Sequence, residues 1–139
     1  MKVFLVLLAG LFLTGLLGIN ESFAATASHT TRTDTGGGVT VKVTYLNPQG
    51  TEDARFEISL DTHSVNLDSY DLKALSLLRD DAGKTSQPTT VENKGSGHHR
   101  QVMLVFPKAG TGSKRLELVI KDIAGVKERA FVWDLGPEN

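Results

Sequence analysis

The sequence contains no cysteine among its 139 residues. This absence excludes a disulfide, a lipid-modified N-terminal cysteine and a blue-copper site, which needs a cysteine ligand. An excess of one charge is missing too, because 15 Lys and Arg against 16 Asp and Glu give a net charge of −1. Nucleic acids and anionic lipid surfaces attract a clustered basic excess, so neither is an expected partner.

Long hydrophobic runs are also lacking, except at the N-terminus. Lys2 is followed by an apolar stretch over residues 3–19 and then by small residues, so residues 1–24 have the pattern of a secretory signal peptide. The small residues permit cleavage after Ala24 or after Ala27, and an uncleaved membrane anchor is the alternative. We expect export to the bacterial periplasm or cell exterior, since an exported domain without disulfides is typical of bacteria, with no membrane span after cleavage.

The remaining chain divides by composition into a tether, one domain and a short tail. Residues 25–37 are rich in Thr, Ser and Gly and predict a flexible tether. Residues 38–135 predict a β domain, and 136–139 a C-terminal tail. Strands are expected at 39–45, 55–60, 74–79, 85–92, 102–106, 116–121 and 131–133, and apolar and polar residues alternate most clearly at 39–45 and 55–60.

About seven short strands without an amphipathic helix indicate an all-β domain, an immunoglobulin-like β-sandwich. A small open β-barrel is the alternative, because strand spacing does not separate the two folds. Pro88 falls inside one expected strand and marks it as an edge strand, since proline lacks the N–H that a ladder needs.

Segments that partly match catalytic motifs lack the residue order or the neighbouring secondary structure that those motifs require. The segment 110–114 has the glycines and lysine of a phosphate-binding loop in the wrong order, and a strand follows it instead of a helix. No nucleophile elbow is present, and Asp80 and Asp81 lie in an expected turn, where they bond their own backbone. We therefore predict that the protein is not an enzyme.

Two polar segments interrupt the strand pattern, Asp61–Ser64 and Gly97–Arg100, and they contain three of the four histidines. Imidazole nitrogens are good ligands for copper and zinc, and carboxylates can complete the coordination sphere. The sequence thus predicts a transition-metal site. Its candidate ligands are His63, His98, His99, Asp61 and Asp68.

Other roles remain open for these residues. The histidines can instead hydrogen-bond loops together, Met103 can be a soft ligand or core filler, and Asp61, Asp68 and Asp71 can bind calcium. The first expectation is an exported, non-catalytic binding protein for copper or zinc. The second is a structural or protein-interaction module of the cell envelope, with an exposed edge such as the Pro88 strand as its docking surface.

The same segments carry a resemblance. The runs 56–68, 97–100 and 131–134 are similar to an uncharacterised group of exported bacterial β-sandwich domains. The resemblance implies the fold over about residues 38–135, with Asp-Thr-His-Ser and Gly-His-His-Arg as the signature of the group. It implies no activity and no ligand.

Overall fold

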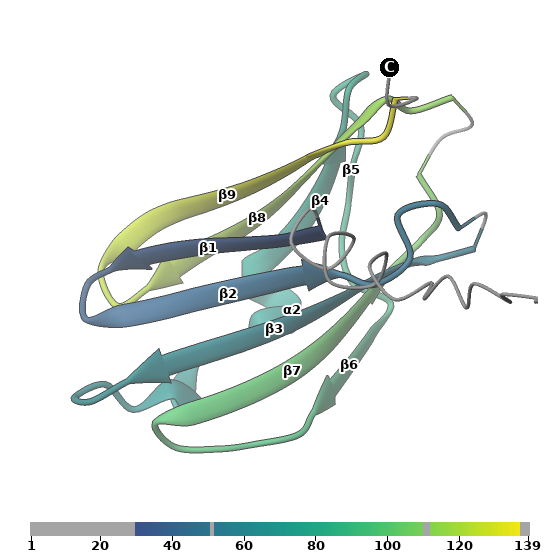
Figure 1. Ribbon diagram of the computed structural model, residues 1–139. Helices are drawn as coiled ribbons and strands as arrows, with labels where there is room; N and C mark the ends of the chain where they lie inside the picture. Colours follow the sequence, from purple (N-terminus) through teal and green to yellow (C-terminus); the bar gives the residue numbers. More distant parts are fainter. Residues whose placement is uncertain (1–29, 51, 110–111, 137–139) are drawn as a thin grey trace, which may run out of the picture.

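A computed structural model describes residues 30–50, 52–109 and 112–136, which form two antiparallel β-sheets packed into a sandwich (Figure 1). The expected signal peptide and the first five residues of the expected tether lie outside the described residues. In the described part of the chain, no helix is long and apolar enough to cross a membrane.

The larger sheet has five strands, in the order β1-β2-β3-β7-β6. They are β1 (Thr31–Gly36), β2 (Val39–Tyr45), β3 (Ala54–Thr62), β7 (His99–Phe106) and β6 (Thr90–Asn93). The smaller sheet has four strands, in the order β5-β4-β8-β9. They are β5 (Thr85–Ser86), β4 (Ser76–Asp80), β8 (Arg115–Ile123) and β9 (Val126–Asp134). A 3-10 helix, η1 (Leu67–Ser69), and a one-turn helix, α2 (Leu72–Leu75), connect β3 to β4.

The strand order is that of the immunoglobulin fold. Strands β2, β3, β7 and β6 occupy the A-B-E-D positions of one sheet, and β4, β8 and β9 occupy the C-F-G positions of the other. Strand β5 adds a C′ strand beside β4, and β1 extends the larger sheet beyond β2. The immunoglobulin-like sandwich is therefore confirmed, and the open barrel is not the fold, because the two sheets do not close into one.

Strand β1 corrects the expected tether. Residues 25–37 were expected to be flexible, but β1 pairs with β2 along its whole length. Thr31 Oγ1 lies 3.0 Å from Thr44 Oγ1 across this pair. Threonine favours strands because its branched side chain suits a pleated surface, yet it gives no apolar alternation from which the strand could be predicted.

Several observed strands are longer than expected, and two expected strands differ from the structure in kind. The expected strand at 85–92 is two strands in different sheets, and the chain crosses between the sheets at Pro88, where the missing N–H ends the ladder. The expected strand at 74–79 begins only after α2. Asp71 starts that helix, because its carboxylate accepts the backbone N–H of Lys73 at 3.0 Å.

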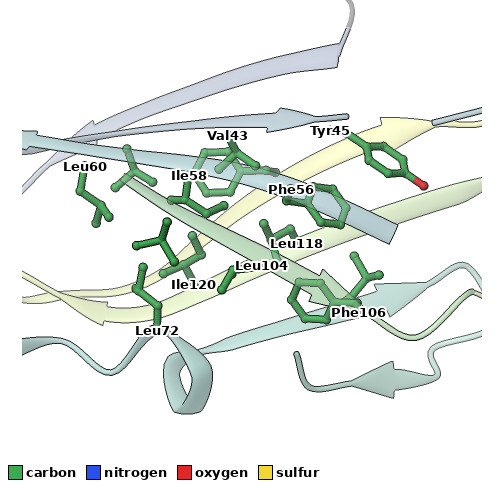
Figure 2. Close-up of a cluster of buried hydrophobic side chains, with 14 of the residues drawn as sticks. Val43, Tyr45, Phe56, Ile58, Leu60, Leu72, Leu104, Phe106, Leu118 and Ile120 are labelled. Atoms are coloured by element: carbon green, nitrogen blue, oxygen red, sulfur yellow. The ribbon is translucent and has the colours of Figure 1, made fainter. Parts of the chain in front are cut away.

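One hydrophobic core joins the inner faces of the two sheets, as the alternation in the sequence predicts (Figure 2). Residues from both sheets, such as Val43 and Leu118, are fully buried. At one end the rings of Tyr45 and Phe56 stack with centroids 4.5 Å apart, and the Trp133 ring lies 5.2 Å from that of Phe56. This aromatic cluster ties β2 and β3 to β9 across the sandwich.

At the other end, the turn between β1 and β2 contacts the turn between β8 and β9. Gly37 has a φ of 60°, and a Cβ built on it would lie 2.1 Å from the carbonyl oxygen of Ala124. The N–H of Ala124 in turn donates to the hydroxyl of Tyr70 at 3.0 Å. Glycine is therefore required at position 37 for both conformation and space.

Candidate functional site

The two histidine-containing segments lie side by side at the end of β3 and the start of β7. Asp61 is directly opposite His99 in the register, and its Oδ1 lies 2.7 Å from His99 Nδ1. Next to this pair, the N–H of Thr62 donates to the carbonyl of His98 at 3.0 Å. Both side chains of the Asp61–His99 pair are largely exposed, so the pair contributes little to stability.

The other predicted metal ligands are not part of the Asp61–His99 pair. Asp68 accepts the backbone N–H of Gly97 at 3.0 Å and so holds η1 against the turn between β6 and β7. Over the residues that the structure describes, no three His, Cys, Asp or Glu are grouped so that they could hold a metal ion. The structure thus joins Asp61 to His99, and copper or zinc binding by the five residues stays a prediction from the sequence.

The last residue of the second segment, Arg100, is the centre of a hydrogen-bond network. It is only 8% exposed, and its Nη1 donates to the carbonyls of Leu67 at 2.8 Å and Tyr70 at 2.7 Å. Its Nη2 and Nε donate to Asn93 Oδ1 at 2.8 and 3.2 Å. A single guanidinium therefore connects β7, β6 and the segment around η1.

The buried position of Arg100 was not predicted from the sequence, although the strand pattern contained the signal. Arg100 is in phase with Val102 and Leu104, whose side chains point into the core, so the strand alternation places it on the inner face. Arg129 on β9 is likewise in phase with buried Phe131 and is 2% exposed. An arginine at an inward position needs buried partners, which makes it a candidate for a structural network.

Arg129 helps to join the adjacent edges of the two sheets. Its guanidinium pairs with Asp34 and donates to the carbonyl of Gly36 at 2.7 Å, which ties β9 to β1. From the other side, Arg32 Nε donates to the carbonyl of Val132 at 3.0 Å. Figure 1 shows β1 beside β9. Side chains thus close the sandwich along this margin.

Strand β6 forms the opposite margin of the larger sheet and, among the described strands, pairs with β7 alone (Figure 1). The N–H of Lys94 donates to the carbonyl of Gln101 on β7 at 2.7 Å. Successive residues of an antiparallel strand direct their backbone groups to opposite sides, so Glu92 also bonds to β7, and Val91 and Asn93 direct theirs outward. No other described strand takes up these outward groups.

Cavities of about 180 to 350 Å³ lie on the described surface, and the one of about 350 Å³, at the turn after β2, is wide open to solvent. One of about 180 Å³ lies between the β4–β5 turn and the end of β7, with Leu78 and Leu116 among its apolar residues and Lys84 and Lys108 among its charged ones. Clefts for drug-sized ligands usually have about 300–1,000 Å³. No protein-family model, curated protein or solved structure matches the chain. The edge of β6 is therefore the strongest candidate site in the described residues.

Proposed function

We propose that this protein is an exported, non-catalytic interaction module of the bacterial envelope or cell exterior. It binds an extended segment of a partner protein, which adds to the larger sheet as a strand beside β6. The observation that carries the proposal is the outward row of backbone groups at Val91 and Asn93. In strand addition these groups supply the affinity, and side chains next to them supply the specificity.

Comparison of the edges favours β6. The edges of β1 and β9 are bridged by Arg32 and Arg129, as described above. Strand β5 consists of only Thr85 and Ser86, which gives a bound segment little backbone to pair with. Strand β6 is longer, and among the described residues no side chain bridges it to the other sheet in the way that β1 and β9 are bridged.

The edge is also held rigidly before binding. Arg100 donates two hydrogen bonds to the side chain of Asn93 from the inner face of the sheet, and a third hydrogen bond connects it to the segment around η1. Val91 is partly buried against the hydrophobic core. A strand fixed in this way loses little conformational freedom on binding, and that raises the affinity for a partner. Export follows from the N-terminal leader and the resemblance to exported domains.

Site-specific photo-crosslinking tests the proposal. A benzophenone amino acid replaces Glu92, which is exposed on β6, or Glu128, which is exposed on the bridged strand β9. The protein is expressed with its leader in the bacterium that produces it, and the cells are irradiated. We expect a discrete crosslinked product from position 92 and none from position 128.

A second substitution shows whether the backbone carries the contact. Val91→Pro removes the outward N–H. Val91→Ala removes a similar amount of the valine side-chain packing but keeps the N–H. The product from position 92 should persist in Val91→Ala and disappear in Val91→Pro. Equal products from both variants would show that strand addition is the wrong mode, and no product from position 92 would overturn the proposed binding at β6.

A further inference from the structure

We propose that the strand added beside β6 is β6 of a second copy of this chain. The inference rests on the proposed function, because it uses the same edge, and it names the partner. Two copies related by a two-fold axis would then join their five-stranded sheets into one continuous antiparallel sheet. Figure 1 shows β6 at the free margin of its sheet, where a second sheet can approach.

The outward backbone groups restrict how the two strands can align. Hydrogen-bonded pairs must form between residues that direct their backbone outward, which are Val91, Asn93 and, by the same alternation, Gly95. Thr89 is not one of them, because its N–H donates to the carbonyl of Val105 on β7 at 2.8 Å. If Asn93 lies opposite Asn93 of the second copy, Val91 lies opposite Gly95. The side chain of Asn93 is held on the inner face by Arg100, so it does not obstruct the approaching strand.

Charge favours this alignment over the two alignments next to it. With Asn93 opposite itself, Glu92 of each copy lies directly opposite Lys94 of the other, and both side chains are exposed. A shift by two residues one way places Glu92 opposite Glu92, and a shift the other way places Lys94 opposite Lys94. Opposite charges directly across a strand pair stabilise it, and like charges destabilise it.

The sequence around β6 also disfavours pairing with other strands. Short strands, a nearby proline and charged side chains are common devices that keep sheet edges from pairing with unrelated strands. Here Pro88 precedes β6, and Glu92 and Lys94 alternate with its outward backbone groups. A strand without the complementary charge order loses both ion pairs, so the edge favours a copy of itself.

Charge reversal with analytical ultracentrifugation tests the inference on the purified exported protein in low-salt buffer. Wild type should dimerise reversibly. Glu92→Lys puts lysine opposite Lys94 in both pairs, and Lys94→Glu puts glutamate opposite Glu92, so each change should raise the dimer dissociation constant about tenfold or more. An equimolar mixture of the two variants should dimerise again, because its mixed dimer has opposite charges in both pairs.

The register can be tested a second time without relying on affinity. The chain has no cysteine, so an introduced one has no competitor. Residues 92 and 94 form a non-hydrogen-bonded pair in the proposed alignment, with their Cβ atoms about 4.5–5.5 Å apart. After mild oxidation, Glu92→Cys mixed with Lys94→Cys should give mainly the mixed disulfide. Equal amounts of mixed and same-variant disulfides would contradict the alignment.

Other outcomes separate this inference from the proposed function. A monomeric wild type, an unchanged dissociation constant in the single variants or a mixture that stays monomeric would overturn the second copy as partner. If position 92 still crosslinks to a different protein and the product needs the N–H of Val91, strand addition survives that failure. If that product is absent as well, both proposals are wrong.

Discussion

Replacing Arg100 with methionine should destabilise the domain by about 3 kcal/mol. The guanidinium is almost completely buried and donates to the carbonyls of Leu67 and Tyr70 and to Asn93 Oδ1. Methionine keeps much of the volume but leaves these acceptors without their donor, and each unsatisfied buried acceptor costs about 1–3 kcal/mol. Relaxation and water entry reduce the total, so about 3 kcal/mol is expected for the network.

Urea denaturation at neutral pH measures this effect through the fluorescence of Trp133, the only tryptophan. Arg100→Lys keeps the charge but cannot reach all acceptors at once, so it should lose less stability than Arg100→Met. Asn93→Ala removes one acceptor at an exposed residue and should cost about 1 kcal/mol. A loss below about 1 kcal/mol for Arg100→Met would refute the role of this residue in joining β6, β7 and η1.

Two further predictions concern residues at the two ends of the sandwich, Gly37 and Tyr45. Gly37→Ala should destabilise the domain by about 3 kcal/mol or more in the same denaturation assay, because a Cβ there meets the carbonyl of Ala124. The control Gly83→Ala, at a residue with a similar positive φ but open space around it, should destabilise the domain by only about 1 kcal/mol. Equal losses of stability in the two variants would contradict the close approach at Gly37. Burial raises the pKa of Tyr45 above its ordinary value of 10.0, so stability should fall as the pH rises above 10.0 and the unfolded chain ionises first. Tyr45→Phe should flatten this alkaline decrease, and an unchanged slope would show that Tyr45 does not cause it.

The core strands could be predicted because burial on one face leaves period-two alternation in the sequence. Val39 to Tyr45 and Phe56 to Leu60 show it, and the structure buries every second residue of both runs. Strand β1 carries threonines and charges, so its pairing depends on β2 and on the glycine turn between them. The helix α2 has one turn, too short for a helical period, and its cap at Asp71 was the only local signal.

The candidate site was harder to predict for a related reason. The sequence drew attention to the histidines by their chemistry, but the pairing of Asp61 with His99 depends on the register of β3 and β7. The open edge of β6 depends on strand order, which no local pattern encodes. Pro88 did indicate an edge, although it lies just before the edge strand and not inside it.

Amide hydrogen exchange at β6 tests the central claim most directly, because it reports on the backbone groups to which a partner would bind. In dilute, unbound protein the amides of Val91 and Asn93 should exchange quickly, while that of Lys94, which donates to β7, is protected. The bound state is then populated by raising the protein concentration or by adding the partner that crosslinking identifies. In that state the amides of Val91 and Asn93 should become protected from exchange. Amides at these two residues that stay unprotected in the bound state would contradict strand addition at β6.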